Sequence, residues 1–330
     1  LNSQSAPDLI PWRQIALPET GPRDRHTALG SDGSSVFFTR AAQANAPFYR
    51  IAKGSSNSAD WQAAASLPLP SGLDINGGAG DLAFLDGALW TLALRDSRSG
   101  ARCIYRYDLG SDSWTKGSTT IGDGPNAACA PLAADRILGG WIGWDMLYNF
   151  TAWSSGASTQ AGSVPGGAAH PWDSCMGGGY AYFLKHRGSP HTNGVLVRLN
   201  QTGALQMNEI AGLPFNPGMG CAIEFLPGQF FRDGHDRLWV LRGGLGSGEG
   251  DGGGWIHDAT AENVAVYDLA TAVWTAGSTG FAVDDGSEAC LAGDTLYVLA
   301  ANGETNPLRF VPLNDPDAPA SRWLTIQSAY

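Results

Sequence analysis

Short runs of β-branched and aromatic residues recur along the chain, and a turn containing Gly, Asp or Asn bounds each run. Runs of this length between turn signals predict strands and not helices. Six of them share a common pattern and lie at residues 36–38, 89–92, 137–138, 180–183, 238–241 and 296–299. The pattern therefore predicts an all-β chain and excludes a helical bundle.

A small residue followed by a short apolar stretch precedes each of these runs. Cys129, Cys175 and Cys221 follow one another at intervals of 46 residues. Further along and earlier in the chain, the equivalent positions are held by Cys290, Ala28 and Leu82. A third strand is predicted at residues 104–109 and 264–269, and a fourth begins at Trp61, Trp114, Trp274 or Trp323. Four short antiparallel strands in each repeat of about 50 residues are typical of one β-propeller blade.

We therefore expect one domain over residues 1–330, a β-propeller of six four-stranded blades. The innermost strands are expected to start near residues 27, 81, 128, 174, 220 and 289. Cys221 and Cys290 are 69 residues apart, which predicts an insertion within residues 225–257. Residues 12–18 and Trp323 both have the pattern of a fourth strand, so one of them is surplus. It either closes the ring by pairing with the last blade or belongs to a seventh, degenerate blade.

Two of the repeats carry a more specific signature. Tyr107-Asp108-Leu109 is followed by Trp114, and Tyr267-Asp268-Leu269 is followed by Trp274. Together with the glycine pairs at residues 139–140 and 243–244, this sequence pattern resembles the kelch repeat. The resemblance implies a propeller, but it implies no activity, because kelch-like propellers include enzymes, sugar-binding proteins and scaffolds.

Composition and charge narrow the functions that the chain can have. It carries 31 acidic and 20 basic residues, a net charge of −11, so it lacks the basic surface that a nucleic-acid partner requires. No apolar run is long enough to cross a bilayer, so we expect no transmembrane segment. The polar start of the sequence favours a mature secreted chain, extracellular or periplasmic. Sequons at Asn149 and Asn200 are relevant in a eukaryote only.

The cysteines and the glycine-rich segment predict neither a metal nor a cofactor. The five cysteines form no Cys-x-x-Cys pair, and their equivalent positions on separate blades favour buried apolar roles. A disulfide that includes Cys103 is the alternative for one of them. Residues 246–254 are rich in Gly and acids, but they lack the repeated Asp spacing of a calcium site, which favours a flap.

Propeller topology assigns the loops to two faces. Loops that lead into the innermost strands and loops that join second to third strands share one face, and five of the six histidines fall there. His235, with Asp233, Asp236 and Arg237, is assigned to the other face as an exposed polar hairpin. On the face that carries the five histidines, the predicted catalytic residues are His170, His186, His191, His257, Arg187 and Arg242. The predicted substrate-binding residues are Arg25, His26, Trp141, Trp144, Asp145, Trp172, Asp173 and Trp255.

This set of residues predicts a glycan partner, because flat aromatic side chains beside charged donors suit sugar rings. The reaction expected of His and Arg without a metal is β-elimination on a uronic-acid polysaccharide, with Arg neutralising the uronate and His moving protons. The alternative is a non-catalytic, lectin-like propeller. A second alternative is a structural or surface-assembly scaffold, which would need none of the histidines.

Overall fold

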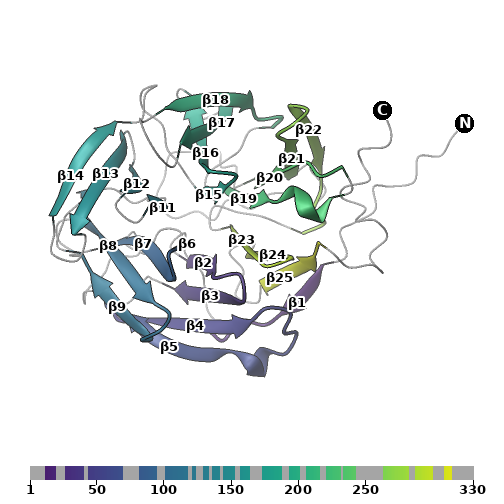
Figure 1. Cartoon of the computed structure of the whole chain (residues 1–330). Coiled ribbons are helices and arrows are strands. Elements are labelled where there is room, and N and C mark those ends of the chain that lie inside the picture. Colours follow the sequence, from purple (N-terminus) through teal and green to yellow (C-terminus); the bar gives the residue numbers. More distant parts are fainter. Residues whose placement is uncertain are drawn as a thin grey trace, which may run out of the picture.

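The computed structural model shows a ring of antiparallel sheets around a central axis (Figure 1). Apart from two short 3-10 helices, the elements described are all strands. The residues that the structure describes are 12–19, 27–40, 44–69, 82–94, 101–117, 121–123, 129–133, 136–141, 144–152, 157–163, 173–187, 193–200, 206–215, 221–231, 233–242, 263–281, 287–299 and 308–313. Within them, no helix combines the length and the apolar character needed to cross a membrane.

Five sheets have the four antiparallel strands expected of a propeller blade. One contains β2 (Thr27–Ser31), β3 (Ser35–Arg40), β4 (Ala46–Ala52) and β5 (Gln62–Leu67). The next two contain β11 (Cys129–Ala133), β12 (Arg136–Trp141), β13 (Trp144–Ala152) and β14 (Ala157–Ser163), then β15 (Ser174–Gly177), β16 (Tyr180–Arg187), β17 (Asn193–Asn200) and β18 (Met207–Gly212). The others contain β19 (Ala222–Leu226), β20 (Arg237–Leu241), β21 (Val264–Asp268) and β22 (Val273–Gly277), then β23 (Glu288–Ala292), β24 (Thr295–Leu299), β25 (Leu308–Pro312) and β1 (Arg13–Ile15). The prediction of an all-β propeller with four-stranded sheets is confirmed.

The remaining sheet has five strands, so the expectation of four strands in every sheet is wrong here. It contains β6 (Ala83–Leu85), β7 (Ala88–Leu94), β8 (Ala101–Asp108), β9 (Ser113–Lys116) and β10 (Ile121–Asp123). β9 pairs with residues 105–108 of β8, whereas β10 pairs with residues 101–102 of the same strand. The two short strands therefore share one edge of β8, where the other sheets have one outermost strand.

The innermost strands contact one another in a closed cycle. β2 contacts β6, β6 contacts β11, and the series continues through β15, β19 and β23 back to β2. The N-terminal strand β1 pairs antiparallel with β25, with Arg13 opposite Phe310 and Ile15 opposite Leu308. The surplus strand predicted at residues 12–18 thus lies at the outer edge of the last sheet, while Trp323 lies outside the described residues.

The core lies between neighbouring sheets and not at the centre of the ring. Phe37 and Phe48 from one sheet, for example, pack with Tyr107 from the next in one buried cluster. Cys175 and Cys221 belong to another cluster, between the β15–β18 and β19–β22 sheets. Four cysteines have described side chains, and all four, Cys103, Cys175, Cys221 and Cys290, are buried thiols, which confirms their predicted apolar role.

The Tyr and Trp residues of the kelch-like signature also serve packing. The rings of Tyr107 and Trp114 are 5.1 Å apart, and those of Tyr267 and Trp274 are 4.9 Å apart. Trp114 Nε1 donates to the Ala65 carbonyl oxygen at 2.7 Å, so its indole joins two neighbouring sheets. In both repeats the Asp after the Tyr accepts backbone N–H groups of the following turn. The signature therefore stabilises the blades and identifies no site.

Candidate functional site

Several predicted site residues lie at the same end of three consecutive sheets. Trp141 and Trp144 are cross-strand partners that end β12 and begin β13. His186 and Arg187 are the last residues of β16 and pair with Gly194 and Asn193. Asp145 follows Trp144, Arg242 follows β20, and Asp173 precedes β15. Because a first strand starts at the end where its antiparallel second strand finishes, all these positions lie at the end that the loop assignment predicted.

The other predicted site residues lie outside the described part of the chain. These are His170, His191, His257, Arg25, His26, Trp172 and Trp255. For Trp141, Trp144, Asp145, His186 and Arg187 the structure describes the backbone and its pairing. Side-chain geometry at this face is therefore described for Asp173 and Arg242.

Arg242 packs over an aromatic ring. Its Cζ atom lies 5.7 Å from the centroid of Phe215, a distance at which a guanidinium is attracted to the ring face. Its backbone N–H donates to the Asn263 carbonyl oxygen at 2.8 Å. The backbone of Arg242 is thus fixed at the end of β20 by Asn263, and its guanidinium packs against Phe215.

Asp173 is buried and joins two sheets. One carboxylate oxygen accepts the Ser174 N–H and the other accepts the Ile223 N–H, each at 2.7 Å. Ile223 belongs to β19, the innermost strand of the next sheet. An innermost strand presents backbone groups with no further strand to bond them, and the Asp173 carboxylate satisfies one of these groups. The residue predicted to bind substrate therefore has a clear structural role.

Glu224 has the same role one sheet further along, and it is not among the predicted site residues. It lies in the middle of β19, where Oε1 accepts the Phe225 N–H at 2.9 Å and Oε2 accepts the Leu291 N–H of β23 at 3.1 Å. Burial, together with the negative charge of Asp173, raises the pKa of Glu224 to about 8. The signal that could have identified it is an acidic residue inside the apolar run Ala222–Leu226.

Glu288 is the third acid of this group and begins β23. Its Oε2 atom is buried and has no hydrogen-bond partner among the described residues. Burial and the charge of Asp173 raise its pKa well above the ordinary value for Glu. The sequence placed Glu288 before an innermost strand, but it was not included in the predicted site. Asp173 and Glu288 lie at the starts of two first strands, and they thus place two carboxyl groups at this end of the ring.

A cavity of about 170 Å³ lies among the innermost strands. Five of these strands contribute to its lining, which is Ser31, Leu82, Ala83, Phe84, Ser174, Cys175, Met176, Glu224, Ala289, Cys290 and Leu291. Ser174 is 7% exposed, and its hydroxyl has no hydrogen-bond partner in the part of the chain that the structure describes. At about 30 Å³ for each water molecule, the space suits a few waters or one polar group of a larger ligand. The available chemistry is the Glu224 carboxyl, whose pKa is raised, and the Ser174 hydroxyl.

A second cluster of ionisable residues lies on the opposite face. The ligand atoms of Asp233, His235 and Asp268 lie within 4.8 Å of one another, and His235 Nδ1 is 2.9 Å from Asp268 Oδ2. However, Arg237 Nη2 lies 2.5 Å from Asp233 Oδ2 and 3.6 Å from Asp268 Oδ2. The guanidinium already supplies the positive charge, so this arrangement is an ion-pair network and not a cation site.

The hydrogen bond from Arg237 lowers the pKa of Asp233. Arg237 itself is 1% exposed, and its Cζ atom lies 4.0 Å from the centroid of Phe231. The expectation of an exposed polar hairpin is therefore wrong for Arg237. The sequence shows a polar run from residue 233 to 237, but it does not show that Phe231 would cover the guanidinium.

No protein-family model matches the chain, and no curated protein matches it. The fold places the protein in the class of β-propellers. The kelch-like sequence pattern of two repeats is explained by the Tyr–Trp packing described above.

Proposed function

We propose that this protein is a glycan-active propeller that acts outside the cytoplasm. Its substrate would lie across the end of the ring that carries Trp141, Trp144, His186 and Arg187. The observation that carries the proposal is that aromatic, imidazole and guanidinium side chains from consecutive sheets belong to hairpins at one end of the ring. Binding residues gathered on loops of a rigid scaffold are typical of functional sites.

The reaction that we propose is β-elimination on a polysaccharide containing uronic acid. Arg187 or Arg242 would neutralise the uronate, which makes the C5 proton more acidic. A neutral histidine, His186 or His170, would take this proton, and the bond between C4 and the glycosidic oxygen would break as the C4–C5 double bond forms. A second histidine, His191 or His257, would return a proton to the leaving oxygen.

The test is to replace His186 or His170 by Ala and to follow the ultraviolet absorbance of unsaturated uronide on a panel of acidic polysaccharides. We expect turnover to fall by about a hundredfold or more, which is the usual contribution of a proton-transfer group. The melting temperature should be retained. The matched control is His235→Ala, on the opposite face, which should keep full turnover. Unchanged turnover in both the His186 and the His170 variants would rule out this mechanism.

A non-catalytic, lectin-like function is the second candidate, and Asp173 at the same end of the ring favours it. Together with burial, the negative charge of Asp173 raises the pKa of Glu224 and of Glu288. The same charge would repel a polyanion, so a neutral sugar would be tolerated better. In that case the protein would bind neutral glycans on an array and produce no unsaturated uronide. Loss of binding in a Trp141→Ala, Trp144→Ala double variant would support this candidate.

We also infer six kelch-like blades in the ring, with the five-stranded sheet counted as one blade. The support is that β9 and β10 lie along a single edge of β8. The sequence of this sheet also carries the Tyr107 and Trp114 signature, which is otherwise clear in the β19–β22 sheet.

A further inference from the structure

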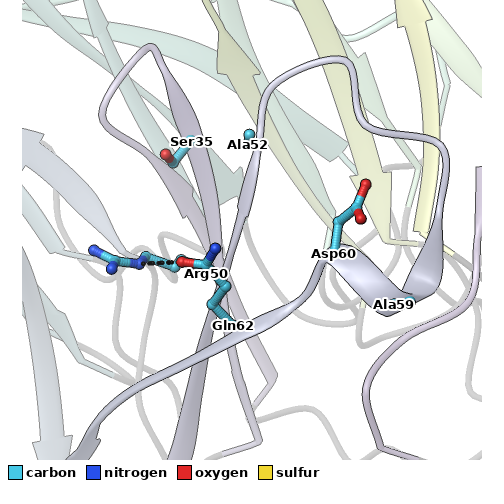
Figure 2. A pocket seen from close by; sticks show the side chains of 6 residues that line it. All are labelled: Ser35, Arg50, Ala52, Ala59, Asp60 and Gln62. Atoms are coloured by element: carbon cyan, nitrogen blue, oxygen red, sulfur yellow. Dashed lines mark hydrogen bonds between the residues drawn. The ribbon is translucent and has the colours of Figure 1, made fainter.

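A pocket on the β2–β5 sheet lies at the opposite end of the ring from the predicted site. Its volume is about 500 Å³, and it is lined by Ser35, Arg50, Ala52, Ala59, Asp60 and Gln62 (Figure 2). Ser35 begins β3 and pairs with Ala52 at the end of β4. Ala59 and Asp60 belong to the 3-10 helix η1 (Ser58–Asp60), which connects β4 to β5. The pocket is therefore formed by a single sheet, at the end where β3 begins and β4 ends.

Arg50 is oriented at one side of the pocket by a neutral partner. Its Nε atom donates to Gln62 Oε1 at 3.3 Å, which leaves the two terminal nitrogens of the guanidinium for another ligand (Figure 2). Hydrogen bonds from Tyr107 and Ala65, and to a lesser extent the charge of Arg50, lower the pKa of the nearby Asp112. That carboxylate already accepts the Tyr107 hydroxyl and the Ala65 N–H through Oδ1. Among the described residues, no carboxylate forms an ion pair with Arg50.

Asp60 lies across the pocket from Arg50 (Figure 2). One of its oxygens accepts a hydrogen bond from the Ser55 hydroxyl. The helix η1 that carries it is capped by Asn57, whose side chain accepts the Ala59 N–H at 3.0 Å. A carboxylate held in this way on a capped turn is a good acceptor for hydroxyl groups. The pocket thus offers a guanidinium and a carboxylate on opposite sides, with a hydroxyl and an amide between.

We propose that this pocket is a second glycan site, which binds a single sugar bearing a carboxylate. Arg50 would pair with the carboxylate of the sugar, since guanidinium and carboxylate form strong, directional pairs. Asp60, Gln62 and Ser35 would bond ring hydroxyls. A doubly charged phosphate fits less well, because Asp60 would repel it. The choice of a sugar as the ligand rests on the proposed glycan function. The preference for a carboxylate rests on the charge pattern of the pocket and is independent of that function.

The experiment is a calorimetric titration of the whole chain with glucuronate, glucose and inorganic phosphate. We expect glucuronate to bind more tightly than either of the others. Arg50→Gln should weaken glucuronate binding by about tenfold or more, as expected for the loss of one charge-assisted pair, and Asp60→Asn by less. Lys53→Gln is the matched control, because it removes the same charge from an exposed side chain that pairs with Asp294 outside the pocket.

Three outcomes would overturn the proposal: no binding of glucuronate, equal binding by the Arg50→Gln and parent chains, or tighter binding of phosphate. The melting temperature of each variant shows whether it is folded. Polysaccharide turnover separates this proposal from the previous one. If turnover depends on His186 but not on Arg50, the two sites are independent. If glucuronate binding is lost in Arg50→Gln while no polysaccharide is cleaved, the pocket stands and the lyase proposal fails.

Discussion

At the scale of single residues, the buried acids near the axis differ in what their oxygens bond. Asp173 and Glu224 each give both oxygens to backbone N–H groups, one of them in the next sheet. Glu288 has a buried oxygen with no partner. A buried carboxyl without a donor is costly to ionise, and burial raises the pKa of Glu288 well above its ordinary value.

The pH dependence of stability follows from this difference. In the unfolded chain a Glu ionises near pH 4.5, whereas the folded pKa of Glu288 lies well above that value. The stability that the protonated form contributes is therefore complete below about pH 4.5 and is lost as pH rises toward the folded pKa. Glu224 adds to the same decline up to about pH 8.

We predict that Glu288→Gln reduces this decline. Gln is neutral at every pH, and no hydrogen bond of the buried oxygen is lost by the replacement. Denaturant unfolding at pH 5 and pH 8 should show a variant that is more stable than the parent chain at pH 8, by roughly 1 to 3 kcal/mol. Glu224→Gln is the comparison, because its new amide N–H₂ would face a backbone N–H and destabilise the protein at both pH values. Parallel pH profiles for the parent and the Glu288 variant would contradict the assignment.

At the scale of elements, neighbouring innermost strands come close enough to require glycine. An added Cβ at Gly30 of β2 would lie 2.4 Å from the Leu82 carbonyl oxygen, in the segment that leads into β6. Backbone on the far side of such a contact cannot move without shifting a whole sheet. Gly30 is thus required by the approach of two sheets and not by a turn.

Gly30→Ala should therefore destabilise the protein by about 2 kcal/mol or more, in the upper range for overpacked cores. Gly212→Ala, in the outermost strand β18, is the matched control, because no atom lies within 4 Å of its added Cβ. The control should be neutral or slightly stabilising, since Ala loses less backbone entropy than Gly. Thermal unfolding followed by circular dichroism measures both. Equal melting temperatures for the two variants would show that the strands can separate without cost.

Strand positions could be predicted from the sequence because apolar runs, turn residues and the cysteine spacing all have a local signal. The Tyr–Trp signature also marked the pairing of a third with a fourth strand in two sheets, since the two residues are cross-strand partners within one repeat. The division of one outer strand into β9 and β10 could not be predicted, because it depends on which half of β8 each segment pairs with. Glu224 was missed for a similar reason: its two partners come from different sheets, and only the closed ring brings Leu291 to it.

At the scale of the whole molecule, the N-terminal segment connects three sheets. β1 pairs with β25, the Ala16 carbonyl oxygen accepts Trp61 Nε1 of the first sheet at 3.0 Å, and the Trp12 ring lies 5.3 Å from that of Phe281, which follows β22. The last sheet thus combines strands from both ends of the described chain. Without this segment β25 would present an unpaired edge, so we expect closure of the ring to depend on it.

Ile15 is the residue whose removal tests this closure most directly. It is 3% exposed and belongs to the buried cluster that includes Leu308, Phe310 and Phe38. Ile15→Ala should cost about 2 to 4 kcal/mol, the usual range for an isoleucine replaced in a core. Gln14→Ala, at the exposed neighbouring position of the same strand, should change stability by less than about 0.5 kcal/mol.

Deleting residues 1–19 should lower the melting temperature further and produce association through β25, detected by light scattering. Deleting residues 1–11 is the control, because it should leave β1 in place. A monomeric 1–19 deletion with the melting temperature of the parent chain would show that the ring closes through contacts other than β1.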